Sequence, residues 1–264
     1  MDNTTKLKEV IEFYSKNGEV VGDHTNLPNK VKVYAGFQIS GEPHLGTYTT
    51  LKRVCSFEKI TDYEVETVIL LADLHSFVNQ KDTFKYKKKL LQFVTKYKEN
   101  KTVLKFGFLE DSTGTSGHQQ EERYWGLVYR IFNRVPFNRL KRCITFANKT
   151  EEDYTPSKSQ LLYVIFQVVD MILLNIDVAI GGIDQRKIHM LYTDLRKKYL
   201  KEENLKKIIF IHHNLFQDSL GVKVSKSLQN YKPLEEILSN IKEDKLEVKG
   251  EVQYLKKNIF DYQI

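Results

Sequence analysis

Hydrophobic and polar positions along the chain follow two periods. Short runs rich in β-branched and aliphatic residues, typical of buried parallel strands, occupy residues 31–37, 65–71, 103–108, 177–180 and 207–212. Between them, apolar residues recur at the spacing of one helix face, which predicts helices at 6–15, 44–59, 83–99, 160–175 and 184–199. Alternating strands and helices predict an α/β fold. We expect a Rossmann-like, doubly wound, mostly parallel sheet whose ligands lie at the carboxyl ends of the strands.

The same patterns divide the chain into three parts. Residues 1–30 are a lead-in, in which a helix is followed by a polar connection, and residues 31–228 hold the core. A short helical tail at 229–264 follows. Residues 109–160 carry a Gly, Ser and Thr-rich patch and then aromatic, arginine-rich helical stretches. They predict a helical insertion between two halves of the sheet, and two ordinary surface helices are the alternative.

Composition indicates a globular protein with a moderate affinity for anions. With 41% hydrophobic residues, 15 Phe and 15 Tyr, the chain can close a sizeable core, which excludes intrinsic disorder. The net charge of +7 favours polyanions such as RNA or nucleotide phosphates. Lysines within 85–89 and 197–207 also fit solvated helix faces, so charge alone supports nucleic acid only weakly.

Cysteine usage and hydropathy indicate a cytoplasmic protein. Cys55 and Cys143 are the only cysteines, which predicts a reducing compartment and neither a structural zinc site nor any other protein-held metal. The amino terminus has no apolar signal region. Residues 161–174 are apolar, but Gln167 and Asp170 interrupt them, and a central aspartate costs about 2.5–3.5 kcal/mol in a bilayer. We expect a buried helix and no membrane association.

Two short motifs suit phosphate chemistry. His44-Leu45-Gly46-Thr47 follows a strand and a loop and opens a helix, where free N–H groups and the helix dipole favour anions. As an isolated tetrapeptide it also fits a surface histidine. Lys223-Val224-Ser225-Lys226-Ser227 places two ammonium groups on a loop, where they could clamp a pyrophosphate leaving group. Alone, this segment also fits an ordinary surface loop.

A polar stripe crosses the apolar helix predicted at 160–175. Tyr163, Gln167 and Asp170 are spaced i, i+4 and i+7, so they share one face. A buried carboxylate and amide without partners cost several kcal/mol, so a polar ligand or an internal hydrogen-bond network must satisfy them. Spacing favours neither over the other.

A strand that ends in two glycines and an acid forms the last candidate. Gly181 and Gly182 allow a ligand close to the backbone, and Asp184 can accept a hydrogen bond from a ribose hydroxyl. The alternative role for Asp184 is that of a helix N-cap.

Taken in this order and spacing, the segments closely resemble tyrosyl-tRNA synthetases, particularly the archaeal and eukaryotic branch of that class I family. Residues 34–47 resemble its first signature, 69–75 its second strand, 167–191 its tyrosine-binding helix and GG-Asp-Gln turn, and 223–227 its KMSKS loop. The resemblance spans roughly 31–228, which it implies is the catalytic domain. The family has its connective insertion and dimer interface at 109–160, which implies a homodimer with contacts from Tyr124, Trp125, Phe132 and Phe137.

The resemblance also implies roles for individual residues. The tyrosine substrate is bound by Tyr34, His75, Tyr163, Gln167, Asp170 and Gln185. ATP is bound by Gly36, Phe37, His44, Gly46, Thr47, Gly182, Asp184, Lys223, Ser225 and Lys226, among which His44, Thr47, Lys223 and Lys226 are catalytic. A phenol donates one hydrogen bond and accepts another, which suits Asp170 beside Tyr34. Related tryptophanyl enzymes also place an aspartate against the indole, and Tyr34, Tyr163 and Gln167 favour tyrosine.

The implied reaction is attack of the amino-acid carboxylate on the α-phosphorus of ATP, with Mg²⁺ on the pyrophosphate, followed by transfer to tRNA(Tyr) through its acceptor stem. Catalysis would come from positioning and charge stabilisation, without a side-chain nucleophile.

Three departures from the family pattern leave other functions open. Thr47 replaces the second histidine of the HIGH motif, and because threonine lacks the reach and possible charge of an imidazole, we expect slower adenylation. Val224 replaces methionine in KMSKS, which is a mild departure. The chain after Ser227 is also too short for the family's usual anticodon-binding domain. The hypotheses are a minimal synthetase that charges tRNA through acceptor-stem contacts, a tRNA-independent adenylating enzyme, and a synthetase-derived RNA-binding protein without turnover. The lysines of the 223–227 loop argue against the last.

Overall fold

The structure of this chain is a computed structural model. It describes residues 6–25, 27–79, 83–98, 101–107, 117–118, 121–144 and 154–215. The predicted loop at 223–227, with Lys223, Ser225 and Lys226, lies outside the described residues, as does the predicted tail at 229–264.

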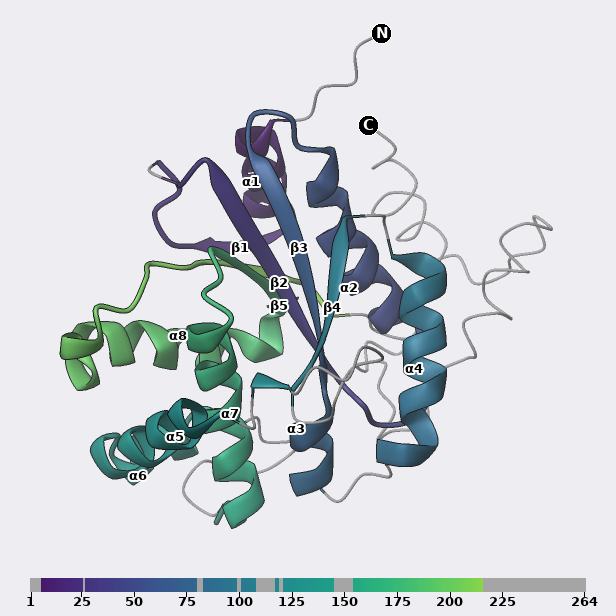
Figure 1. Cartoon of the computed structure of the whole chain (residues 1–264). Helices are drawn as coiled ribbons and strands as arrows, with labels where there is room; N and C mark the ends of the chain where they lie inside the picture. Colours follow the sequence, from purple (N-terminus) through teal and green to yellow (C-terminus); the bar gives the residue numbers. More distant parts are fainter. Residues whose placement is uncertain are drawn as a thin grey trace, which may run out of the picture.

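Within the described residues, six strands form one sheet (Figure 1). They are β1 (Gly18–Val21), β2 (Lys30–Gln38), β3 (Glu64–Ala72), β4 (Thr102–Phe106), β5 (Val178–Gly182) and β6 (Ile209–His213). Their order is β1-β6-β5-β2-β3-β4, and every neighbouring pair is parallel except β1 with β6. The predicted α/β class with a mostly parallel sheet is confirmed.

Helices cover both faces of this sheet (Figure 1). They are α1 (Leu7–Asn17), α2 (Leu45–Ser56), α3 (Asp73–Val78), α4 (Thr83–Tyr97), α5 (Glu122–Arg134), α6 (Phe137–Lys141), α7 (Lys158–Leu173) and α8 (Arg186–Asp194). Shorter helical turns are η1 (Phe57–Lys59), η3 (Ile183–Gln185), η4 (Leu195–Tyr199) and η5 (Lys201–Glu203). The single helix predicted at 184–199 is therefore a 3₁₀ turn, an α-helix and a π turn in succession.

One strand was missed by the sequence analysis, which predicted a polar connection after the first helix. Residues 18–21 instead form β1, antiparallel to β6, with Gly18 opposite His213 and Val21 opposite Phe210. Four half-buried residues are too few to show a period of two, and the partner strand lies far along the chain. Only the pairing reveals this strand.

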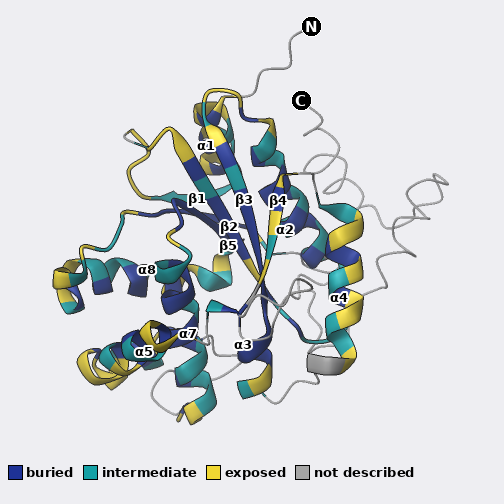
Figure 2. Ribbon diagram, in the orientation of Figure 1, coloured by how far each residue is buried: buried dark blue, intermediate teal, exposed yellow. Residues whose placement is uncertain are grey.

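Side chains that alternate along β2 divide the interior into two cores. Val31, Val33 and Ala35 face a cluster with α1, α2 and α4. Tyr34 faces the opposite cluster, which α5, α7 and α8 complete. Figure 2 shows the buried residues gathered on the sheet and on the helix faces turned toward it. Because successive side chains of a strand point to opposite faces of the sheet, Tyr34 points toward α7.

The order of the strands places a crevice at one edge of the sheet. From β2 the chain moves to β3 and β4 on one side, and it returns to β5 and β6 on the other. Chain connections thus leave β2 and β5 in opposite directions, and ligands of doubly wound folds bind at the carboxyl ends of such strands. These ends are Gln38 and Gly182.

The described part of the predicted insertion packs into the core. Tyr124, Leu127 and Ile131 of α5 are fully buried against the α7 side of the sheet. Arg130 and Arg134 of the same helix pair with Glu203 and Glu202. One face of α5 thus contributes to the core, as in any amphipathic helix, so both the insertion and the alternative of surface helices stay predictions.

None of the helices in the described ranges combines the length and hydropathy needed to cross a bilayer. The apolar segment that raised this question is α7, whose buried positions contact the second core.

The N-terminal cap of α7 can be tested by substitution. Ser157 accepts a hydrogen bond from the Gln160 N–H, and Gln160 Oε1 accepts one from the Ser157 N–H, which forms a capping box. We expect Ser157→Ala to lower the unfolding free energy by about 1 kcal/mol in urea denaturation. Thr155→Ala, at an exposed neighbouring position, is the control. Equal stabilities of both variants and the wild type would contradict this role.

Candidate functional site

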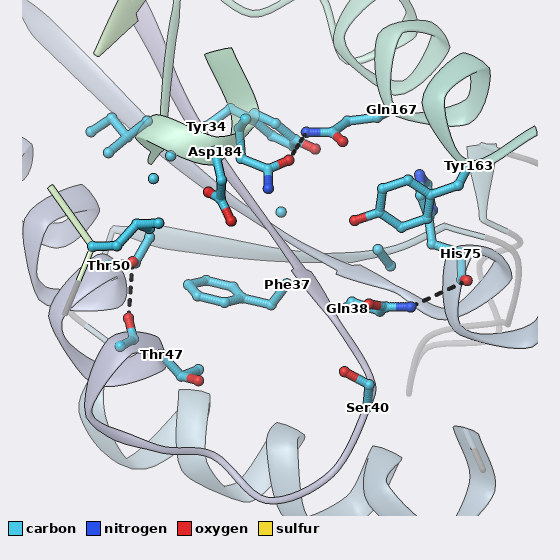
Figure 3. Close-up of a pocket in the computed structure, with 18 of the residues that line it drawn as sticks. Tyr34, Phe37, Gln38, Ser40, Thr47, Thr50, His75, Tyr163, Gln167 and Asp184 are labelled. Carbon is cyan, nitrogen blue, oxygen red and sulfur yellow. Dashed lines mark hydrogen bonds between the residues drawn. The ribbon is translucent and has the colours of Figure 1, made fainter. Parts of the chain in front are cut away.

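A cavity of about 620 Å³ lies at the carboxyl ends of β2 and β5 (Figure 3). Its size is in the range of small-molecule sites. Thirteen of the predicted site residues line it: Tyr34, Gly36, Phe37, His44, Gly46, Thr47, His75, Tyr163, Gln167, Asp170, Gly182, Asp184 and Gln185. The structure therefore brings together segments that lie up to about 150 positions apart. Their roles in binding stay predictions.

The two ends of the cavity differ in chemistry. Figure 3 shows Tyr163, Gln167 and His75 on one side, Thr47 and Thr50 on the other, and Phe37 between them. The first group comes from α7 and α3, the second from the start of α2.

A glycine two positions along the strand makes room for the Tyr34 ring. Tyr34 and Gly36 point to the same face of β2, and a Cβ added to Gly36 would lie 2.7 Å from Tyr34 Oη. The ring thus lies along the strand over Gly36. Burial raises the pKa of Tyr34 well above its usual value, and the nearby Asp170 charge adds to this effect. The phenol is therefore protonated at neutral pH.

The polar stripe of α7 takes part in an internal hydrogen-bond network, one of the two predicted alternatives, and it also lines the cavity. The alternative of a polar ligand stays a prediction. Gln167 Nε2 donates to Gln185 Oε1 at 3.0 Å (Figure 3). Its own Oε1 is buried and has no hydrogen-bond partner within the described part of the chain. Burial raises the pKa of the Tyr163 phenol to about 12, so it is also protonated. This stripe can therefore donate and accept hydrogen bonds at the cavity wall.

Asp170 is the most buried charge of the site, with 0% of its surface exposed. His118 Nε2 lies 2.7 Å from Oδ1, and His75 Nε2 lies 3.3 Å from Oδ2. Of these two contacts, that of His118 has the geometry of a hydrogen bond. Burial lowers the pKa of His75, although the charge of Asp170 opposes this. His75 is therefore neutral at neutral pH, and its ring packs edge-on against Tyr163.

His44 begins the helix at the other end of the cavity. As the N-cap of α2, its Nδ1 accepts a hydrogen bond from the Gly46 N–H at 3.0 Å. Thr47 Oγ1 accepts from the His44 N–H at 3.4 Å. Because Nδ1 is the acceptor, the hydrogen of a neutral ring lies on Nε2. A Cβ at residue 46 would lie 2.9 Å from the ring, so glycine is needed for this arrangement.

The GG turn brings Asp184 back over the end of β5. A Cβ on Gly182 would lie 2.6 Å from Asp184 Oδ1. Asp184 lies inside η3, and the N-cap residue of α8 is Gln185. The alternative of an α-helix N-cap at Asp184 is therefore wrong, because a 3₁₀ turn precedes the α-helix.

The chain matches known proteins over most of its length. Residues 26–258 match the family model described as tRNA synthetases class I (W and Y). The chain belongs to this family. A tyrosine–tRNA ligase of Methanospirillum hungatei is 35% identical over 200 residues, which cover 76% of this chain and 60% of that enzyme.

Solved structures of synthetases share the fold of this family member. Tyrosyl-tRNA synthetase of Archaeoglobus fulgidus, solved with L-tyrosine, matches with a TM-score of 0.63 and 26% identity over 91% of this chain and 70% of that one. Tryptophanyl-tRNA synthetase of Campylobacter jejuni matches with a TM-score of 0.56 and 19% identity over 76% of this chain and 61% of that one, a likeness of fold alone.

Several residues of the site were missed by the sequence analysis of this synthetase-family chain. His189 and His213 line the cavity. His118 does not line it, but contacts the carboxylate of Asp170. Burial lowers the pKa of both His189 and His213 to about 3, so they are neutral. A histidine next to a strand end is a weak signal for His213, whereas no periodic pattern surrounds His118.

No group of three His, Cys, Asp or Glu side chains within the described ranges is arranged to hold a metal ion.

Replacement of Gly36 tests the packing of the Tyr34 ring. We expect Gly36→Ala to lower the unfolding free energy by about 1–3 kcal/mol, because the added methyl group must displace a buried ring. Gly126→Ala on α5 is the matched control, since its Cβ would meet nothing within 4 Å. It should instead raise stability by up to about 1 kcal/mol. Urea denaturation that ranks the two variants equally would contradict this packing.

Proposed function

We propose that this chain activates tyrosine with ATP and transfers it to tRNA(Tyr). The observation that carries this proposal is one cavity lined by Tyr34, Gln167 and Asp170 as well as by His44 and Asp184. The first set suits an amino acid with a polar ring, and the second suits a nucleotide. The match covers only 60% of the length of the M. hungatei enzyme, so the activity of a whole synthetase is part of the proposal.

The amino-acid end of the cavity supports tyrosine. Asp170 would accept a hydrogen bond from the substrate phenol, and the protonated Tyr34 hydroxyl would donate one to it. Phenylalanine can make neither of these hydrogen bonds, so its binding would bury both groups without the bonds that tyrosine supplies, which disfavours it. Tyr163, Gln167 and Gln185 would hold the α-ammonium group, for which the buried Gln167 Oε1 is an acceptor. Tryptophan is the second candidate, since Asp170 could also accept from an indole N–H.

The nucleotide end supports ATP. His44 would donate from Nε2 to a phosphate, next to the backbone N–H groups at the start of α2. Asp184, brought over the strand end by Gly182, would accept from a ribose hydroxyl. Thr47 would replace the missing second histidine with a shorter donor. Lys223 and Lys226 are proposed to clamp the pyrophosphate.

Magnesium is proposed to bind through the nucleotide. His44 and Thr47 are hydrogen-bond donors rather than carboxylates, so they fit the phosphates and not the ion. When bound to the phosphate oxygens, Mg²⁺ would neutralise charge on the departing pyrophosphate.

The geometry favours a reaction without a side-chain nucleophile. With tyrosine held by α7 and ATP held by α2 and the GG turn, the substrate carboxylate would meet the α-phosphorus between them. Its oxygen would form the new P–O bond as pyrophosphate leaves. The buried histidines His189 and His213 are neutral, so they are not expected to act as general acids. Positioning and charge stabilisation would supply the rate.

Exchange of labelled pyrophosphate into ATP, measured with each of the twenty amino acids, tests this function. We expect exchange with tyrosine and a fall in kcat/KM of about tenfold or more in Asp170→Asn, because a hydrogen bond to a charged acceptor is lost. Asp23→Asn, at an exposed site, is the control. Exchange with tryptophan instead would contradict the tyrosine assignment. A lack of exchange with every amino acid would favour an RNA-binding protein without turnover.

Addition of tRNA(Tyr) separates the remaining hypotheses. Acylated tRNA is the expected product, and its absence despite active exchange would favour a tRNA-independent adenylating enzyme.

We also propose a homodimer through α5 and α6. Tyr129, Phe132 and Phe137 are more than half exposed on these helices, and exposed aromatic residues are common at interfaces. The expected contact at Tyr124 is wrong, because that ring is fully buried within its own chain. The ring of Trp125, another expected contact of the dimer, packs edge-on against Phe166 of its own chain.

Sedimentation measurements test the dimer. We expect Phe132→Glu to shift the protein to a monomer, because the new charge would be buried at the interface without a partner. Phe77→Glu, on a 71% exposed residue of α3, is the matched control and should remain dimeric. A wild-type monomer would refute the proposal.

A further inference from the structure

The carboxylate of Asp170 needs a donor from the protein itself. It is fully buried on α7, and an ionised group removed from water costs several kcal/mol unless hydrogen bonds replace its hydration. His118 supplies such a bond to Oδ1 at 2.7 Å, a length typical of charge-assisted hydrogen bonds. The contact of His75 with Oδ2 is longer, at 3.3 Å. Of the two histidines, His118 is therefore the one that constrains the carboxylate more closely.

His118 stands apart from the other residues around Asp170. It lies between β4 and α5, does not line the cavity, and is largely buried, with 11% of its side chain exposed. Its ring packs edge-on against Tyr124, with centroids 5.8 Å apart. Two contacts thus hold the His118 ring: an aromatic contact with Tyr124 and a hydrogen bond to Asp170.

This arrangement constrains what Asp170 offers to a ligand. An ionised carboxylate can only accept hydrogen bonds, so His118 Nε2 carries the hydrogen between them. The hydrogen bond restricts rotation of the Asp170 carboxylate, because Oδ1 accepts it from the His118 ring, which packs against Tyr124. Oδ2 is then directed to the side of His75, which does line the cavity. An acceptor oriented in this way favours a side chain that ends in a donor.

We propose that His118 is a positioning residue that sets the amino-acid selectivity of this site by holding Asp170 in place. This inference rests on the proposed function, because it assumes that an amino-acid side chain occupies the Asp170 end of the cavity. It assigns a role to a residue that directly follows the Gly, Ser and Thr-rich patch at 111–117. His118 acts on a tyrosine ring through Asp170, without touching it.

Three substitutions separate the hydrogen bond from the packing. His118→Phe keeps a ring against Tyr124 and removes the donor. His118→Gln keeps an N–H donor of similar reach and removes the ring, whereas His118→Ala removes both. His24→Ala, at an exposed site, is the control for loss of a histidine.

Calorimetric titration with tyrosine and with phenylalanine is the first measurement, because it does not depend on turnover. In His118→Phe and His118→Ala we expect tyrosine affinity to fall by about tenfold or more, the value of a hydrogen bond to a charged group. Phenylalanine affinity should change less than about threefold, so that the preference for tyrosine falls. His118→Gln should keep most of that preference. In exchange assays, KM for tyrosine should rise while KM for ATP stays constant.

The opposite order of variants would overturn the inference. If His118→Phe keeps the preference and His118→Gln loses it, His118 serves only as packing. Equal losses of tyrosine and phenylalanine affinity, or a wild type that binds both equally, would also overturn it. A wild type that prefers tyrosine in the titration but gives no pyrophosphate exchange would contradict the proposed function alone, and the comparison of the variants would still decide the role of His118.

Discussion

Burial of one carboxylate is the constraint on which the site depends. Asp170 lies on α7 inside the second core, where an ionised group without partners would cost several kcal/mol. Histidines from two other segments approach its oxygens, so α7, α3 and the chain before α5 must pack together for the charge to be tolerated. The packing that forms this core therefore also forms the polar end of the cavity.

The rest of the cavity is built from polar groups whose protonation is fixed by burial. Burial raises the pKa of the Tyr34 and Tyr163 phenols, and it lowers the pKa of His75, His189 and His213. These rings are consequently neutral across the physiological range. A buried wall of neutral donors and acceptors around one carboxylate recognises a ligand by hydrogen-bond geometry, which suits discrimination between similar side chains.

Three glycines around the cavity allow these side chains to approach. Gly36 makes room for Tyr34, Gly46 for the ring of His44, and Gly182 for Asp184. In each place a Cβ would lie less than 3 Å from the functional side chain. The glycines thus shape the cavity because side chains of the protein itself pack against their backbone. They also leave the backbone open to a ligand.

The sequence by itself determined the class of fold and the approximate positions of the buried parallel strands, because hydrophobic period is a local property. Through the resemblance carried by its ordered motifs, it also predicted thirteen residues that line one cavity. It did not determine β1, whose four residues show no period and depend on pairing with β6. It also did not determine that Tyr124 is internal or that His118 meets Asp170, 52 positions away. Contacts between distant segments are set by packing of the whole chain, so only the tertiary structure decided them.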